Sequence, residues 1–124
     1  MAYMLLILEP VGQRAERTEA EGRELYAAMQ QFGAALAARG QLRAVESLAS
    51  QQGAARVRAP AGPGGSVQVV DGPFAEAKEM IGGFFLLQNV DRAQAIALAA
   101  ECPAARWATV EVRALAPCFE GSAA

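Results

Sequence analysis

Two short apolar runs, residues 3–8 and 83–87, constrain the fold of this sequence more than any other feature. Each run is too short for a helix; the first is closed by Glu9-Pro10, and the second begins directly after Gly82. Neither run alternates between apolar and polar residues, which is typical of strands that are covered on both faces. The sequence therefore predicts a sheet whose two strongest strands need cover on both sides.

A first helix is predicted between these runs. Thr18 and Glu21 form a T-x-x-E capping box, and Gly40 is suited to the left-handed residue that ends a helix, so we expect a helix over residues 19–39. Apolar side chains repeat at helical spacing inside this range, at Leu25, Met29, Phe32 and Leu36. This spacing predicts a helix that packs one face on the sheet.

A second helix is predicted after the second apolar run. Asp91 and Gln94 have the spacing of an N-cap and its N3 partner. Ala93, Ile96, Ala97 and Ala100 form an apolar stripe after them. Because Pro103 cannot continue a helix, we expect this one to end near Glu101.

A hairpin is predicted in the middle of the chain. Residues 55–58 and 66–70 are short alternating runs on either side of a Pro- and Gly-rich segment at residues 60–65. This pattern is typical of two strands joined by a loose tip. Arg56 and Arg58 lie on the solvated face of the expected hairpin, and we interpret them as charges that keep an edge soluble.

Weaker strands at residues 42–48 and 107–115 complete the order strand, helix, strand, hairpin, strand, helix, strand. This order predicts an α+β, ferredoxin-like βαββαβ fold with an inserted β-hairpin. With 124 residues the chain has the size of one domain, which we expect over residues 1–116, followed by a loosely ordered tail over residues 117–124.

Two helices can cover only one face of such a sheet, yet both strong strands are apolar on both faces. A large apolar face is rarely left exposed on a monomer. We therefore expect a homodimer that forms through the sheet face and closes into an α/β barrel.

Composition excludes several classes of function. The chain has no histidine, and its two cysteines, Cys102 and Cys118, lack the spacing of metal ligands, so we expect no metal, no haem and no other cofactor. A net charge of −2 without a basic cluster argues against a nucleic-acid partner. No stretch approaches the length of a membrane span, and we predict a cytoplasmic protein without a membrane partner.

Residues 71–79 concentrate special backbone chemistry and ionisable groups. Asp71-Gly72-Pro73 predicts a rigid turn, in which Asp71 accepts backbone N–H bonds or acts as a catalytic carboxylate. In the first case we expect the substitution Asp71→Ala to cost ~1–3 kcal/mol. Phe74 after the turn is a candidate core anchor or pocket wall.

Three charged residues follow, Glu76, Lys78 and Glu79, and they are either a solvated loop or part of a site. In a site, a carboxylate such as Glu76 would act as acid or base, and Lys78 would tune its pKa or bind an anion. Tyr3 and Arg113, on strands of the same expected sheet, are further candidate ligand-binding residues, with a core position and an edge position as their alternatives.

Several segments resemble a known family. The string Asp71-Gly72-Pro73-Phe74-Ala75-Glu76-Ala77-Lys78-Glu79, with Tyr3-Met4-Leu5-Leu6-Ile7, Ile81-Gly82-Gly83-Phe84 and Glu111-Val112-Arg113, is similar to the DGPF subgroup of the YCII-related family. The resemblance implies a ferredoxin-like fold that dimerises into an α/β barrel, and a poorly defined role. Some YCII proteins carry a His–Asp pair, which this chain cannot supply. Some DGPF proteins are associated with extracytoplasmic-function sigma factors, which implies by analogy a sigma-factor-related partner.

Two functions remain open. The first is a dimeric protein of undefined biochemical role that binds a small molecule or a protein partner in or near the barrel. The second is a cofactor-independent isomerase or lyase that moves a proton with Asp71 or Glu76. A cavity with a desolvated carboxylate would favour the enzyme.

Overall fold

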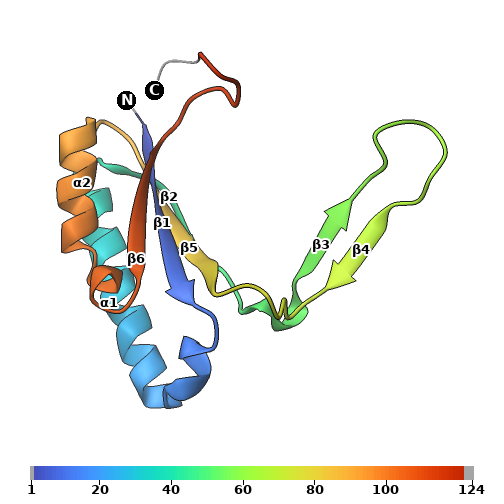
Figure 1. Ribbon diagram of the computed structural model, residues 1–124. Coiled ribbons are helices and arrows are strands. Elements are labelled where there is room, and N and C mark those ends of the chain that lie inside the picture. Colours follow the sequence, from blue (N-terminus) through green and yellow to red (C-terminus); the bar gives the residue numbers. More distant parts are fainter. Residues whose placement is uncertain (1, 122–124) are drawn as a thin grey trace.

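The computed structural model describes residues 2–121 and has the α+β architecture that the sequence predicts (Figure 1). Its elements, in chain order, are β1 (Tyr3–Pro10), η1 (Gln13–Glu16), α1 (Glu19–Ala38), β2 (Leu42–Ser47), η2 (Gln51–Gly53), β3 (Ala55–Arg58), β4 (Gln68–Asp71), β5 (Glu79–Leu87), α2 (Arg92–Glu101), η3 (Pro103–Arg106) and β6 (Thr109–Ala114). No helix among the described residues is long and apolar enough to cross a membrane.

Four strands form one antiparallel sheet in the order β2-β5-β1-β6, and both long helices lie on one face of it (Figure 1). The strong strands β1 and β5 are neighbours in the middle of the sheet, while β2 and β6 are its edges. This order confirms the ferredoxin-like fold. The predicted dimer contact would be on the other face, which no helix covers.

Local capping sets the ends of both helices as the sequence predicts. The hydroxyl of Thr18 accepts a bond from the backbone N–H of Glu21, whose carboxylate accepts one from the N–H of Thr18 in return. Asp91 and Gln94 form the same reciprocal box at the start of α2. Gly40, with φ of 70°, follows α1 in the left-handed conformation.

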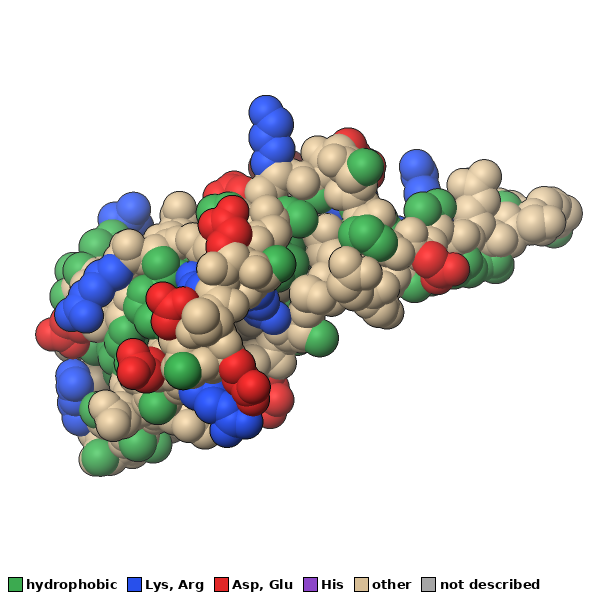
Figure 2. All heavy atoms as spheres, turned by 90° about the horizontal axis from the view of Figure 1, so that it is seen from below, with side chains coloured by type: hydrophobic (Ala, Val, Ile, Leu, Met, Phe, Trp, Pro, Cys, Tyr) green, Lys and Arg blue, Asp and Glu red, His purple; other side chains and the backbone are tan. Residues whose placement is uncertain are grey.

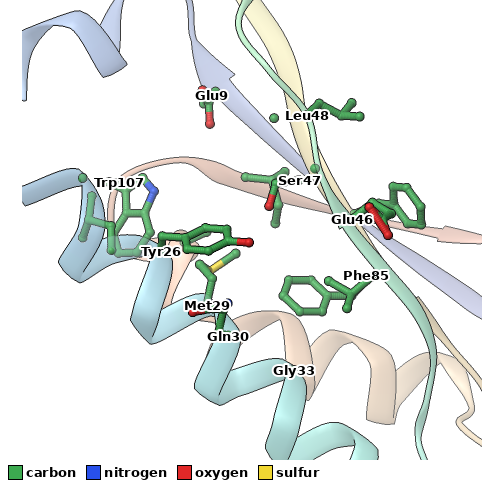
Figure 3. Close-up of a pocket in the computed structure, with 18 of the residues that line it drawn as sticks. Glu9, Tyr26, Met29, Gln30, Gly33, Glu46, Ser47, Leu48, Phe85 and Trp107 are labelled. Atoms are coloured by element: carbon green, nitrogen blue, oxygen red, sulfur yellow. The ribbon is translucent and has the colours of Figure 1, made fainter. Parts of the chain in front are cut away.

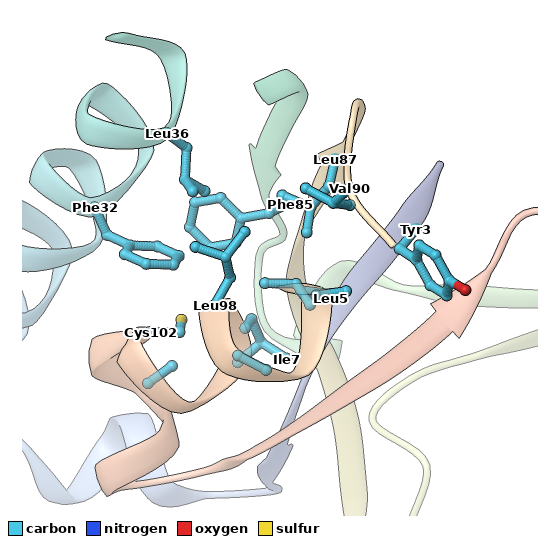
Figure 4. Close-up of a cluster of buried hydrophobic side chains, with 13 residues drawn as sticks. Tyr3, Leu5, Ile7, Phe32, Leu36, Phe85, Leu87, Val90, Leu98 and Cys102 are labelled. Carbon is cyan, nitrogen blue, oxygen red and sulfur yellow. The ribbon is translucent and has the colours of Figure 1, made fainter. Parts of the chain in front are cut away.

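The core lies between the helices and the covered sheet face (Figure 4). Alternate residues of β1 point into it, and Leu5 is fully buried there. The ring of Phe32 from α1 meets the ring of Phe85 from β5 edge-on, with centroids 5.2 Å apart. Leu36 and Leu87, also fully buried, close the layer between α1 and the sheet.

The opposite sheet face, here called the open face, is apolar along its two central strands. The β1–β5 register aligns Met4 with Leu86, Leu6 with Phe84 and Leu8 with Ile81, and paired residues of an antiparallel sheet share a face. Five of these side chains are partly buried, and the sixth, that of Ile81, is exposed. Both strands are therefore apolar on two sides, and residues 2–121 fully cover only one of these sides.

The strand boundaries differ from the expected ones at β1, β4, β5 and β6. β1 continues past residue 8 to Pro10, and β4 covers Gln68–Asp71 instead of residues 66–70. β5 begins at Glu79, four residues before the expected run, because its first residues continue the ladder to Pro10 and Glu9 of β1. The register shifts between Ile7, which pairs with Gly83, and Leu8, which pairs with Ile81, so that Gly82 is an extra residue of β5 without a partner in β1. β6 begins at Thr109, since Trp107 ends the turn η3 instead of starting the strand.

The predicted hairpin forms a separate two-stranded sheet, β3–β4, that we call the arm. It projects from the body of the molecule on the side away from the helices (Figures 1 and 2). Its root is held by a 2.7 Å bond from the N–H of Gly72 to the carbonyl of Ala54. Gly72 precedes Pro73 through a cis peptide bond, and a Cβ at Gly72 would collide with the carbonyl oxygen of Gln51.

The described residues after β6, 115–121, contain no helix or strand. They are exposed, and residues 118–121 form bends and turns. Residues 122–124 of the predicted tail lie outside the described residues.

Candidate functional site

A groove of about 1180 Å³ opens between α1 and the sheet (Figure 3). Val45 and Ser47 of β2 form one wall, and Tyr26 and Met29 of α1 form the other. Phe85 lines it toward the core. The groove therefore lies on the helix side of the sheet, whereas the sequence placed the candidate cavity on the opposite, barrel side.

Glu9 lies at the polar end of this groove and is its most unusual residue. It continues the alternation of Leu5 and Ile7 along β1, so its side chain points to the helix side. Only 5% of its surface is exposed, and it is the one buried charged residue in the described part of the chain. A buried carboxylate requires compensation, because removal from water penalises its charge.

Arg14 supplies that compensation from the short turn η1. Its Nε donates to Oε1 of Glu9, its Nη1 to the carbonyl of Leu48 at 2.8 Å, and its Nη2 to the carbonyl of Gly82 at 3.3 Å. One guanidinium thus joins the end of β1, the residue after β2 and the middle of β5. Gly12, in the left-handed region with φ of 91°, turns the chain so that η1 returns toward the sheet.

The two glycines of β5 make room for this arrangement. A Cβ at Gly82 would collide with Oε2 of Glu9 and lie 3.0 Å from Nη2 of Arg14. A Cβ at Gly83 would stand 2.7 Å from the carbonyl oxygen of Glu46 on the neighbouring strand. The Gly82-Gly83 pair is therefore required by the buried ion pair and by close contact between strands.

Oε2 of Glu9 is the atom that a ligand could use. It accepts no hydrogen bond from any of residues 2–121, and Glu9 lines the groove. The remaining walls are largely apolar, with the ring of Tyr26 beside Met29 and with Trp107 near the base of α1 (Figure 3). The guanidinium of Arg17 lies 5.9 Å from the centroid of the Trp107 ring.

The charges around the groove balance. Its lining includes three acidic residues, Glu9, Glu19 and Glu46, and three arginines, Arg14, Arg17 and Arg23. Arg23 is bound to Glu19 at 2.7 Å on the exposed side of α1. The groove thus combines an apolar body with a neutralised polar end, which suits an uncharged or zwitterionic molecule of metabolite size.

The predicted residues around the turn lie elsewhere, beside a smaller hollow of about 580 Å³ at the root of the arm, which Phe74 and Glu79 line. The guanidinium of Arg56 lies 3.8 Å from the centroid of the buried Phe74 ring and bonds Glu76 at 3.0 Å. Arg56 therefore anchors the arm, beyond the solubilising role that the sequence suggested. Both partners of this ion pair are more than half exposed, at 52% and 75% of their side-chain surfaces.

Asp71 and Lys78 have no such role among the described residues. Asp71 is exposed at the end of β4, and its carboxylate makes no hydrogen bond or ion pair with residues 2–121. The expected turn bonds of Asp71 are thus missing, since backbone contacts of Gly72 hold the turn instead. Lys78 is exposed, and its backbone carbonyl accepts a bond from the N–H of Val11.

Tyr3 and Arg113 belong to one sheet, as predicted, but to opposite faces of it. Tyr3 is buried in the core at the far end of β1 from Glu9. Arg113 pairs with Met4 on the open face and lies 3.8 Å from Glu111. The structure therefore brings neither residue to the turn or to the groove.

Metal binding finds no support in the described residues, and neither does thiol chemistry at the buried Cys102. No group of three or more acidic, histidine or cysteine side chains there could hold a metal ion. Cys102 is buried in the core with its Sγ 3.9 Å from Sδ of Met29, and this burial raises the pKa of its thiol. A raised thiol pKa makes Cys102 a poor nucleophile.

Comparison with known proteins identifies the family. The sequence profile of the YCII-related domain matches residues 1–118, nearly the whole chain. A search of curated proteins finds no match. The profile match and the ferredoxin-like sheet agree, and the chain belongs to the YCII-related domain family.

Proposed function

We propose that this protein binds a small, uncharged or zwitterionic molecule in the groove between α1 and β2. The observation that carries this proposal is the buried carboxylate of Glu9, which has one oxygen engaged by Arg14 and one without a partner. A ligand donor at that oxygen would gain a charge-assisted hydrogen bond. The apolar body of the ligand would contact Phe85, Met29 and Val45.

Trp107 provides a direct probe of this site, because it lines the groove and is the only tryptophan in the chain. Compounds that raise the melting temperature of the protein would be tested for a change in tryptophan fluorescence. Binding in the groove should produce both signals at the same ligand concentration. A compound that stabilises the protein without changing the fluorescence binds elsewhere.

A matched pair of variants makes the test specific. Val45 and Ile96 are 41% and 42% exposed, but only Val45 lines the groove. Val45→Phe should fill the groove and abolish binding, whereas Ile96→Phe on α2 should leave it unchanged. Glu9→Gln should weaken binding about ten-fold, which corresponds to one charge-assisted bond. Equal binding by wild type and Val45→Phe would refute the proposed site.

An enzyme is the second candidate, and the same carboxylate favours it. Oε2 of Glu9 could take a proton from a carbon next to a carbonyl group, as an isomerase or lyase requires. A bound carbonyl compound would then exchange that hydrogen for deuterium in D₂O, which proton NMR detects. Glu9→Gln should stop the exchange. Wild-type protein that binds the compound without exchange would be a binding protein only.

A homodimer through the open face completes the proposal. Its support is the stripe of Met4, Leu6, Leu8, Ile81, Phe84 and Leu86, which no element of the described chain covers. Leu6→Glu places a charge in the middle of this stripe and should give a monomer by sedimentation analysis. Ile96→Glu on the helix side should remain a dimer. A wild-type monomer at micromolar concentration would refute this part alone.

The chain also fits the DGPF subgroup of the family, through Asp71-Gly72-Pro73-Phe74. Two residues of the string support this assignment by their contacts at the root of the arm: Gly72 donates a hydrogen bond to the carbonyl of Ala54, and the ring of Phe74 contacts Arg56. In the proposed function this string is a structural element that orients the arm. The ligand site is the groove on the other side of Leu48, a residue that lines both the groove and the smaller hollow at the root of the arm.

A further inference from the structure

The arm is the part of the molecule that the proposed function leaves without a purpose. It consists of two strands only, and neither pairs with the main sheet. A two-stranded hairpin in water is marginally stable at best, and further packing is normally needed to hold it. The arm nevertheless forms a regular ladder from Ala55–Asp71 to Arg58–Gln68.

The two faces of the arm differ in chemistry. Val57 lies opposite Val69, and these side chains are 63% and 59% exposed. The next pairs on either side place Arg56 with Val70 and Arg58 with Gln68 on the other face. The second face carries the two arginines and Gln68 beside Val70, which is itself 58% exposed. The valine face has Asp71 at its root, and nothing in the described chain covers its β-branched pair, Val57 and Val69.

The position of the arm indicates what covers the valine face. The arm leaves the molecule at the ends of β2 and β5 and projects on the side of the sheet away from the helices (Figure 1). That is the side on which the open face lies. We infer that the valine face of the arm packs against a second copy of this chain, so that each protomer of the dimer clasps the other.

The dimensions agree with this inference, which rests on the proposed dimer. The two strands of the arm, Ala55–Arg58 and Gln68–Asp71, each span roughly 13 Å at ~3.3 Å per residue. Two sheets packed face to face lie ~10 Å apart. The ladder of the arm is therefore long enough to reach the sheet of a partner that covers the open face. Two-fold symmetry would give each dimer two such contacts.

The root of the arm is fixed before any partner binds. Arg56 stacks on the buried ring of Phe74 and bonds Glu76, and Gly72 bonds the carbonyl of Ala54. These contacts set the direction of the arm within one protomer. A preorganised arm loses less conformational entropy on association than a flexible segment would.

Two double variants, each changing one cross-strand pair, test the clasp. Val57→Thr with Val69→Thr keeps the β-branched shape and makes the valine face polar. Arg58→Thr with Gln68→Thr is the control, which introduces the same two residues at a pair that is already polar on the other face. The first pair should raise the dimer dissociation constant about ten-fold or more, and the second should change it less than about two-fold. Sedimentation at a series of concentrations measures both.

Hydrogen exchange separates the clasp from the dimer itself. In the wild-type dimer the amides of β3 and β4 should exchange at least about ten times more slowly than in the monomeric Leu6→Glu variant. Two results together would refute the clasp and leave the open-face dimer intact. The arm amides of the wild-type dimer would be unprotected, and the dimer dissociation constant of the Val57→Thr, Val69→Thr variant would equal that of wild type. A wild-type protein that stays monomeric would refute both.

Discussion

Two Arg–Glu pairs in this molecule have the same chemistry and opposite surroundings. Arg14 and Glu9 meet at the end of the sheet, where their side chains are 35% and 7% exposed, and Arg14 also binds two backbone carbonyls. Arg56 and Glu76 meet on the arm, where both are mostly in water. The comparison shows that the number of charges in a segment does not locate a site; what matters is how little water reaches them.

The largest difference between the pairs should appear when the arginine is removed. Arg14→Met would leave Glu9 buried without its counter-ion and two carbonyls without a donor, so the free energy of unfolding should fall by about 2–4 kcal/mol. Because Arg14 is partly exposed, this expected loss in the free energy of unfolding is smaller than that for breaking a fully buried ion pair. Urea unfolding measures the loss. A loss no larger than that of Arg56→Ala would show that the two pairs are equivalent.

A smaller effect is expected when the Glu9 charge is removed and its shape is kept. Glu9→Gln retains an oxygen that can accept from Nε of Arg14, so we expect a loss of about 1–2 kcal/mol. The double variant Glu9→Gln with Arg14→Met should be less destabilised than the sum of the two single changes. The reason is that the double variant has no charge at either position, whereas each single change removes the partner of the side chain that remains. Strict additivity would mean that the two side chains stabilise the fold independently.

Removal of the arm pair should cost little. Glu76→Ala breaks only an exposed ion pair, worth ~0–1 kcal/mol. Arg56→Ala also loses the contact with Phe74, which adds ~0.5–1 kcal/mol at such a site. Thermal unfolding of both variants beside wild type measures the difference. A Glu76→Ala loss equal to that of Arg14→Met would contradict the comparison.

The smallest effect belongs to Asp71. Because its carboxylate has no partner in the described chain, Asp71→Ala should change stability by less than about 0.5 kcal/mol, below the 1–3 kcal/mol that a turn-capping role predicts. Gly72→Ala is the informative contrast, since its Cβ would collide with the carbonyl oxygen of Gln51. A large loss for Asp71→Ala would restore the capping role.

Local signals in the sequence predicted the fold well. The two capping boxes and Gly40 set the helix ends, since each depends on residues within one turn of one another. The apolar runs identified β1 and β5, and their two-sided pattern predicted the open face. The start of β5 was predicted too late, because its first residues are held by pairing with β1 and not by their own character.

The candidate site could not be predicted in the same way. Glu9 was interpreted as the end of a strand because Pro10 follows it, although its spacing from Leu5 and Ile7 already places it on the covered face. Arg14 lies 34 residues from Leu48 and 68 from Gly82, and no local pattern reports such contacts. A charged residue that continues the period of a buried strand is the signal that would have found Glu9.

The central place of β1 also determines how the chain can fold during its synthesis. β1 is made before the other strands of the sheet, but its neighbours are β5 and β6, which lie in the second half of the given sequence. The helix α1 can form as soon as it leaves the ribosome, whereas the first strand has no main-sheet neighbour until about residue 79 has been made. The apolar segment of residues 3–8 must therefore stay soluble until β5 has been made, and the main sheet closes only when β6 follows.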